Sequence, residues 1–288
     1  MEPAFPEAVV KRIERLRALD PVADKLQAAV RGLVPQESQL KDVLSGTWLG
    51  HPVHPLLTDA VIGAWTSAVI LDLVGGEDGE RAADRLVAVG ILAAGPTAVT
   101  GASDWAELRG GTRRIGSMHA IGNTTALVLH SLSWAARKRG ARRRGVALSM
   151  LGYGLAGFSA FLGGDLSFRL GVGVNQTAFE DVPDQWTAVL DESRLEEGRL
   201  IGAQAGGVGV LLVRRVGRVH ALADRCSHRG CALHRGRLND DDTVTCPCHG
   251  STFRLDGSIV KGPATAAQPS FKVRTNERVV EVMRTAPS

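Results

Sequence analysis

The chain has 288 residues, enough for two domains, and 44% of them are hydrophobic, with a formal net charge of +4 at pH 7. The excess of basic residues is local, because six of them fall in one short loop without interleaved aromatic residues: Arg137, Lys138, Arg139, Arg142, Arg143 and Arg144. A nucleic-acid-binding surface is therefore a poor explanation of the charge, and membrane topology is a better one.

The first 50 residues have the pattern of amphipathic helices and lack the apolar core of a signal peptide. Apolar residues recur at helical spacing in two runs, from Val9 to Leu16 and from Val22 to Leu33. Between the runs, Asp20 and Pro21 are typical of the start of a helix. We expect these helices to pack on a helical bundle or to lie at its surface.

Four apolar stretches follow, at 55–74, 86–103, 118–136 and 146–163. Each has about 18 to 20 residues, close to the ~20 that span a bilayer as a helix. They are rich in Gly and Ala, which permits close approach between spans. We expect an all-α bundle of four transmembrane helices in a multi-pass protein of the cell membrane. A soluble four-helix core is the alternative.

The first stretch follows the sequence Gly50-His51-Pro52-Val53-His54-Pro55 and contains Asp59. The last stretch ends at Gly163-Gly164. In these features this half of the chain resembles an uncharacterised bacterial membrane-protein family with four spans. The resemblance implies no function.

Alternating span directions would gather seven polar residues on one side of the membrane: His51, His54, Asp59, Asp104, His119, Asn123 and Asp165. Ionisable groups at membrane depth are costly and suggest a functional site by default. Three explanations stay open for them. They line a pocket for a quinone or another small molecule, they ligate a haem between helices, or they only cap helices and fix helix contacts.

From Trp186 the pattern changes to short alternating strands, with hairpin turns expected at Val216-Gly217-Arg218 and Asn276-Glu277. We therefore expect an α + β multidomain chain in which an all-β antiparallel domain follows the helical bundle. The expected division is 1–50 for amphipathic helices, 51–165 for the bundle, 166–185 for a tether and 186–288 for the β domain.

Two motifs in the β domain each combine one cysteine with one histidine: Cys226-x-His228 and Cys246-x-x-His249. A mononuclear zinc site uses the same four residue types, but zinc fingers normally keep the cysteines in one pair and the histidines in the other. A plain disulfide loop is a further alternative. The mixed pairs suit a [2Fe-2S] cluster in which two cysteines hold one iron and two histidines hold the other.

Because of these two motifs, the segment from roughly residue 186 to residue 284 resembles the Rieske family. The resemblance implies that Cys226 and Cys246 bind one iron and that His228 and His249 bind the other. It also implies a disulfide between Cys231 and Cys248, as in the Rieske subunits of quinol-oxidising complexes; the alternative is two free thiols in a reducing compartment.

The same resemblance assigns residues that tune the cluster. The Ser251 hydroxyl would donate a hydrogen bond to a cluster sulfide. Phe253 stands where the high-potential branch of the family has a tyrosine, so one of two expected hydroxyl donors is missing. Gly262, Pro263 and Ala264 match the proline loop that covers the cluster.

These features predict a membrane-anchored carrier that takes one electron from a quinol or a protein donor and passes it to a redox partner. One alternative is a ferredoxin-like component that supplies an oxygenase or reductase. The other is an oxidoreductase that uses the polar residues of the bundle, so whether the protein is itself an enzyme stays open.

The basic loop at 137–144 predicts the orientation, because short cytoplasmic loops carry an excess of Lys and Arg. The β domain would then lie on the extracytoplasmic side, where a disulfide stays oxidised. Three arginines next to each other, Arg142 to Arg144, resemble an internal twin-arginine signal. Four basic residues on the other side oppose this orientation: Lys41, Arg109, Arg113 and Arg114.

Overall fold

The computed structural model describes residues 5–285, which form two compact units. The first comprises Met1–Val34 with Val53–Val172 and is helical; the second comprises Pro35–Pro52 with Gly173–Ser288 and is built on antiparallel strands. The helical and antiparallel β layout is the one expected from the sequence. Residues 35–52 belong to the β unit although they precede the bundle in sequence, and the segment expected as a tether, 166–185, is divided between the two units after Val172.

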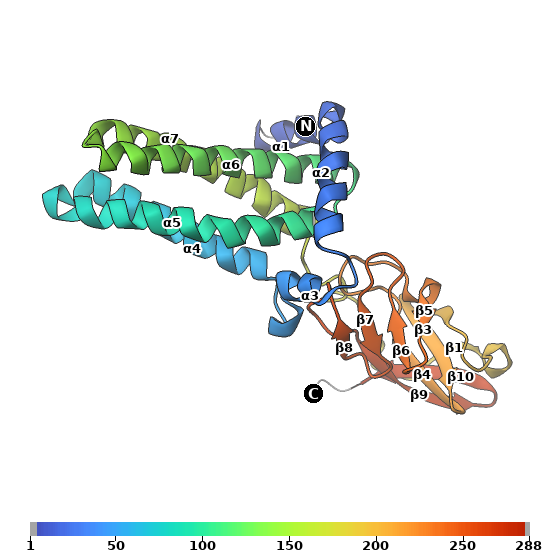
Figure 1. The fold of residues 1–288 in the computed structure, drawn as a ribbon. Coiled ribbons are helices and arrows are strands. Elements are labelled where there is room, and N and C mark those ends of the chain that lie inside the picture. Colours follow the sequence, from blue (N-terminus) through green and yellow to red (C-terminus); the bar gives the residue numbers. More distant parts are fainter. Residues whose placement is uncertain (1–4, 286–288) are drawn as a thin grey trace. The chain divides into compact units, whose positions relative to one another are not determined.

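Four long helices form the bundle and lie side by side in Figure 1: α4 (Val53–Val74), α5 (Gly76–Trp105), α6 (Gly110–Lys138) and α7 (Arg142–Gly164). Two shorter helices, α1 (Phe5–Glu14) and α2 (Asp20–Leu33), pack at one end of it. The short turns between consecutive long helices make neighbours antiparallel.

The bundle has small and polar residues inside and large apolar residues outside. Gly90 leaves room for the ring of Trp65, since a Cβ on this glycine would lie 2.1 Å from Trp65 Nε1. Leu73, Leu92 and Leu151 are exposed on three different helices, and Leu92 keeps 76% of its surface accessible. Close packing of small residues under an apolar exterior is the arrangement of helices surrounded by lipid.

Within the described residues, three helical segments are long and apolar enough to cross a membrane: Val53–Val74, Gly76–Trp105 and Arg142–Arg169. The expected fourth span, at 118–136, lies in α6 but is not among them. The reason is composition, because this stretch contains several polar residues, including His119, Asn123 and His130. Its exposed residues include Ile121 and Val128, so averaging along the helix hides an apolar outer face.

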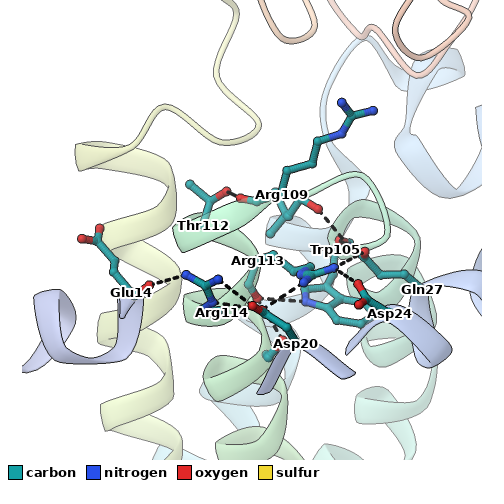
Figure 2. A network of polar contacts seen from close by, with 11 residues as sticks. Glu14, Asp20, Asp24, Gln27, Trp105, Arg109, Thr112, Arg113 and Arg114 are labelled. Atoms are coloured by element: carbon teal, nitrogen blue, oxygen red, sulfur yellow. Dashed lines mark hydrogen bonds and ion pairs between the residues drawn. The ribbon is translucent and has the colours of Figure 1, made fainter. Parts of the chain in front are cut away.

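Polar contacts hold α2 across one end of the bundle (Figure 2). Arg113 and Arg114, in the first turns of α6, both bind Asp20, and Arg113 also binds Asp24. Gln27 donates to the main-chain oxygens of Trp105 and Leu108, each at 3.0 Å.

The apolar run that predicted α2 does not make this attachment. Val22, Leu26 and Leu33 are exposed, whereas Ala23 and Gln27 are the buried residues of the helix. The helix is therefore fixed by hydrogen bonds and ion pairs, and its apolar stripe faces outward.

A second ion-pair network closes the opposite end of the bundle. Arg137 binds Asp72 and Asp84, and the side chains of Arg137 and Asp72 are fully buried. Arg142 binds the same two aspartates at 2.7 and 3.0 Å and also Glu80. Buried charges are tolerated when they are paired in this way.

The β unit contains two sheets. A six-stranded sheet has the order β1-β10-β9-β4-β3-β2, and a four-stranded sheet has the order β5-β6-β7-β8, with antiparallel neighbours throughout. The strands are β1 (Thr187–Asp191), β2 (Ile201–Ala205), β3 (Val208–Arg215), β4 (Arg218–Ala223), β5 (Arg237–Leu238), β6 (Thr243–Thr245), β7 (Thr252–Arg254), β8 (Ile259–Lys261), β9 (Ser270–Asn276) and β10 (Val279–Arg284).

Two tight hairpins link β3 to β4 and β9 to β10. Val216 and Gly217 form the first turn, as expected, while Glu277 and Arg278 form the second, one residue later than expected. All four residues have positive φ, which is the conformation of a two-residue hairpin whose twist matches its strands. β5 and β7 are short strands of two and three residues in the four-stranded sheet.

The β unit has two apolar cores. One lies on the six-stranded sheet and includes Val210, Leu212 and Val282. The other contains Leu211, Val244, Phe253 and both of the cysteines Cys226 and Cys246. The cysteine loops are therefore anchored directly in a core of the unit.

Candidate metal centre

The two motif loops are built alike. The first follows β4, and the second joins β6 to β7. In the first loop, the main-chain N–H of Cys226 donates to Cys231 O at 2.9 Å, and Gly230 N donates to Cys226 O at 2.8 Å. In the second, Cys246 N donates to Ser251 O at 2.8 Å and Gly250 N to Cys246 O at 3.2 Å. Each loop thus closes with bonds across the same spacing.

The positions of the two glycines explain this repeated turn. Gly230 and Gly250 have φ of 72° and 80°, a left-handed conformation that glycine adopts without steric cost. Each lies four residues after the first cysteine of its loop, which turns the chain back toward that cysteine.

The four candidate ligands lie in two layers. Cys226 and Cys246 are buried, and their sulfur atoms are hydrogen-bonded to each other. His228 and His249 are half-buried, and their rings stand nearly perpendicular with centroids 5.1 Å apart. The loops therefore bring one pair of sulfurs together inside the domain and one pair of imidazoles together nearer its surface.

The two thiols influence each other's protonation strongly. The hydrogen bond to Cys246, together with burial, raises the pKa of the Cys226 thiol well above its usual range. The same hydrogen bond lowers the pKa of Cys246 to about 7. Two adjacent buried thiols cannot both ionise unless a cation lies between them. The donor set, two thiolates inside and two imidazoles outside, fits a [2Fe-2S] cluster of Rieske type with one iron on each pair.

A disulfide joins the two loops, as the resemblance implied. Cys231 and Cys248 are bonded, with Cα atoms 6.5 Å apart, and they lie 17 positions apart in sequence. Cys226 and Cys246 are the free cysteines. The covalent link therefore connects the loops beside the ligands and leaves both inner thiols for metal.

Ser251 is fully buried, and its Oγ accepts a hydrogen bond of 3.0 Å from the main-chain N–H of Ala264. Because the oxygen accepts that bond, the serine keeps its own O–H to donate elsewhere. Gly262 and Pro263 lead into Ala264, so the expected proline loop contacts the expected tuning serine. Phe253, also fully buried, packs in the core that contains Cys226 and Cys246.

Sequence reasoning missed Gln268, which is buried just after the proline loop. Its side-chain oxygen accepts from Ser227 N at 3.0 Å, and its amide nitrogen donates to the main-chain oxygens of Ala223 and Arg225. It thus braces the first ligand loop on both sides of Cys226. No local pattern marks such a residue, because the partners of its side chain are more than 40 positions away in sequence.

His234 follows the first motif loop and is half-buried. Its Nδ1 lies 2.7 Å from Asp224 Oδ2, and its ring packs on Gly202, where a Cβ would lie 2.5 Å from the ring nitrogen. This contact with β2 is not visible in the local sequence.

The structure brings together three of the seven polar residues expected to cluster in the membrane half. The rings of His54 and His119 lie 6.4 Å apart, and Asn123 Nδ2 lies 3.0 Å from His119 Nε2. Main-chain oxygens of Thr97 and Ser159 accept from the Nδ1 atoms of the two histidines.

The other four residues do not join this group. Asp59 is exposed, and Asp165 is paired with Arg169 at 2.7 Å. Asp104 is half-buried near the end of α5. His51 belongs to the β unit, where it is exposed.

Two family models match different parts of the chain. The Rieske [2Fe-2S] domain matches residues 185–272, and the predicted membrane protein family DUF2231 matches residues 50–176.

Relatives match the β domain. The cytochrome b6-f complex iron-sulfur subunit of Chlorobaculum tepidum is 32% identical over 73 residues, which is 25% of this chain and 39% of that protein. The 3-phenylpropionate/cinnamic acid dioxygenase ferredoxin subunit of Escherichia coli is 40% identical over 58 residues, 20% of this chain and 55% of that protein. The chain therefore spans well under two thirds of these relatives.

Among solved structures, the ferredoxin of carbazole 1,9a-dioxygenase from Nocardioides aromaticivorans IC177 aligns with 35% of this chain and 99% of its own, at 21% identity and a TM-score of 0.33. Taken with the paired ligand loops, the family matches identify the protein as one that carries a DUF2231 membrane domain followed by a Rieske [2Fe-2S] domain.

Proposed function

We propose that the protein is a membrane-anchored one-electron carrier that connects a quinol or protein donor to a redox partner protein. When bound, a Rieske cluster supplies reversible one-electron transfer at a potential raised by its imidazole ligands. The observation that carries the proposal is the layered ligand set, in which Cys226 and Cys246 are buried and His228 and His249 lie nearer the surface. A partner would approach the histidine side.

The disulfide favours a quinol-linked carrier over a ferredoxin. Cys231 and Cys248 have the pairing that the resemblance to quinol-oxidising Rieske subunits implied, and one relative is the iron-sulfur subunit of a cytochrome b6-f complex. The buried Ser251 supports the same branch, because its free O–H is available to a cluster sulfide. A ferredoxin-like role is the second candidate, supported by the similarity to a dioxygenase ferredoxin subunit.

The proposal includes four membrane spans, with α6 as the fourth. The support is the exposed apolar face of α6, which includes Ile121, Val128 and Leu132, combined with a polar face that the neighbouring helices cover. A polar face turned toward the bundle interior is the usual placement of ionisable groups in a span.

The test uses the full chain purified in detergent. We expect two iron and two labile sulfide atoms per chain and a Rieske-type paramagnetic signal after reduction. Reduction of the cluster by a short-chain quinol would support the quinol-linked role. Reduction only by a reduced protein donor would favour the ferredoxin-like role, and one zinc without sulfide would exclude both.

A further inference from the structure

A short segment before the membrane helices folds as part of the Rieske unit. Residues 35–52 contain helix α3 (Gln39–Ser45) and the 3-10 helix η2 (Thr47–Leu49). Ser38 caps α3 by accepting from Lys41 N at 3.1 Å, and Gly46 ends the helix by donating to Asp42 O. This local structure places Asp42 in the first turn of α3 and Thr47 just beyond the end of the helix. We call residues 35–52 the clasp.

The clasp holds the proline loop at two points. The main-chain N–H of Gly262 donates to Asp42 Oδ1 at 2.8 Å, and Thr47 Oγ1 donates to Ala264 O at 3.2 Å. The first contact joins residues that are 220 positions apart in sequence, and the second joins residues that are 217 positions apart. The two contacts lie on either side of Pro263, so they fix both ends of the turn that the proline makes.

The fit leaves no space for a larger residue. A Cβ on Gly262 would lie 2.1 Å from Thr47 Oγ1 and 3.0 Å from Asp42 Oδ1. The clasp also contacts the second ligand loop, because a Cβ on Gly250 would lie 3.1 Å from Glu37 Cγ. The Lys261 ammonium donates to Glu37 O at the edge of the same contact.

The proline loop connects the clasp to Ser251 through Ala264. Thr47 binds the carbonyl of Ala264, and the N–H of the same residue donates to Ser251 Oγ at 3.0 Å. Ala264 and Ser251 are both fully buried. A shift of the loop would therefore change where the serine hydroxyl can point.

We propose that Asp42 and Thr47 are positioning residues for the cluster: they hold the Gly262–Ala264 loop so that Ser251 keeps its O–H directed at the ligand site. The inference rests on the proposed electron-carrier function. It adds that a segment separated in sequence from the Rieske domain by the whole membrane bundle helps to set the potential. The Asp42 carboxylate also places a negative charge beside the loop, which disfavours the reduced cluster.

The experiment compares variants that separate the hydrogen bond from the charge. Asp42→Asn keeps an acceptor for Gly262 N and removes the charge, so the midpoint potential should rise. We expect the equilibrium constant for reduction to increase about threefold, which is about 28 mV for one electron. The shape of the paramagnetic signal should stay parental. Asp181→Asn, at an exposed position of the same unit, is the matched control and should change neither.

Asp42→Ala and Thr47→Val remove the hydrogen bonds. In these variants the g values of the paramagnetic signal should shift, and Thr47→Ser should restore the parental signal because it keeps the hydroxyl. Hydrogen exchange at the Gly262 amide should become about tenfold faster in Asp42→Ala, because that amide loses a charged acceptor.

Parental g values and potential in Asp42→Ala and Thr47→Val, at full iron and sulfide content, would overturn the inference even if these variants unfold at a lower temperature. The iron and sulfide content of the parent protein tests the proposed function separately. If the parent holds no cluster, exchange at the Gly262 and Ala264 amides still decides the clasp, and unchanged exchange in Asp42→Ala would refute it.

Discussion

The main-chain N–H of Ala264 donates to the side-chain oxygen of Ser251 across 3.0 Å, and neither residue is exposed. This bond uses one lone pair of the hydroxyl and fixes its oxygen. The O–H is left to donate, and in this domain the group that gains charge on reduction is the cluster. We propose that this backbone contact leaves the Ser251 hydroxyl free to stabilise the reduced cluster.

Ser251→Ala should lower the midpoint potential by some tens of millivolts. A hydrogen bond to a charged group contributes roughly 1.5 to 3 kcal/mol, but only the difference between the oxidised and reduced states moves the potential. For one electron, ~1.4 kcal/mol corresponds to about 59 mV. Redox titration followed by the paramagnetic signal measures the shift. Ser258→Ala, in the exposed turn after β7, is the control and should leave the potential unchanged.

Phe253→Tyr should raise the potential by a similar amount. The side chain is fully buried in the core that holds both free cysteines, so an added phenol can reach a cluster sulfide and stabilise its extra charge. The two potentials are compared at the same pH. An unchanged or lower potential would mean that the ring of residue 253 does not face the cluster.

His228→Ala and His249→Ala should each abolish the Rieske-type signal, because one iron loses a protein ligand. The matched control is His234→Ala. His234 is a half-buried histidine of the same domain that contacts Asp224 and lies outside both motif loops. The His234→Ala protein should keep the Rieske-type signal and the iron content of the parent. Loss of the signal in the control as well would point to a general folding defect.

The four candidate ligands could be proposed from the sequence because each lies within three residues of the other ligand of its loop. The disulfide was implied by the resemblance to the Rieske family, and the structure contains it. The alternating pattern of the strands is also local, so it could be recognised in the sequence. The antiparallel β domain therefore followed from short-range patterns alone.

Long-range contacts left no such pattern. Asp42 binds Gly262 across 220 positions, and its own neighbourhood looks like any amphipathic helix. Gln268 is also invisible locally, although it braces the loop around Cys226. The hydropathy of α6 was ambiguous for a different reason. The polar residues of α6 lie on a face that other helices cover. An average of hydropathy along the sequence counts these residues in full and does not distinguish the covered face from the exposed one.

Asp20 makes the attachment of α2 sensitive to acid. Hydrogen bonds from Arg114 and Arg113 lower its pKa from 3.8 to about 2. A carboxylate with a lowered pKa stabilises the folded state above its unfolded pKa, near 3.9, and this contribution disappears as the pH falls through about 2. The parent should therefore unfold at a higher temperature than Asp20→Asn at pH 7. That difference in Tm should be constant down to about pH 4 and shrink toward pH 2. A difference that does not depend on pH would contradict a role for the carboxylate charge.

The basic residues of the loops between the long helices carry a prediction of the orientation. In the loop at 137–144, Arg137 and Arg142 bind acidic residues of the bundle, whereas Lys138, Arg139, Arg143 and Arg144 are exposed. At the other end of the bundle, Arg113 and Arg114 are paired with Asp20, and Arg109 is exposed. Compared with residues 109–114 alone, the loop at 137–144 has six basic residues against three, and four exposed ones against one. The positive-inside rule then predicts that this loop is cytoplasmic and that the Rieske domain is extracytoplasmic. The exposed basic residues of α1 and α2, such as Lys11 and Lys25, lie at the same end as Arg109 and oppose this orientation.

Two engineered cysteines test this orientation. Gln204→Cys lies at an exposed position of β2, and Ala141→Cys lies at an exposed position of the basic loop. An impermeant thiol reagent should label Gln204→Cys in intact cells and should reach Ala141→Cys only after lysis. The parent controls for background, because two of its cysteines form the disulfide and the other two are buried. The reverse pattern would place the Rieske domain in the cytoplasm, and the disulfide between Cys231 and Cys248 would then have to persist against a reducing thiol pool.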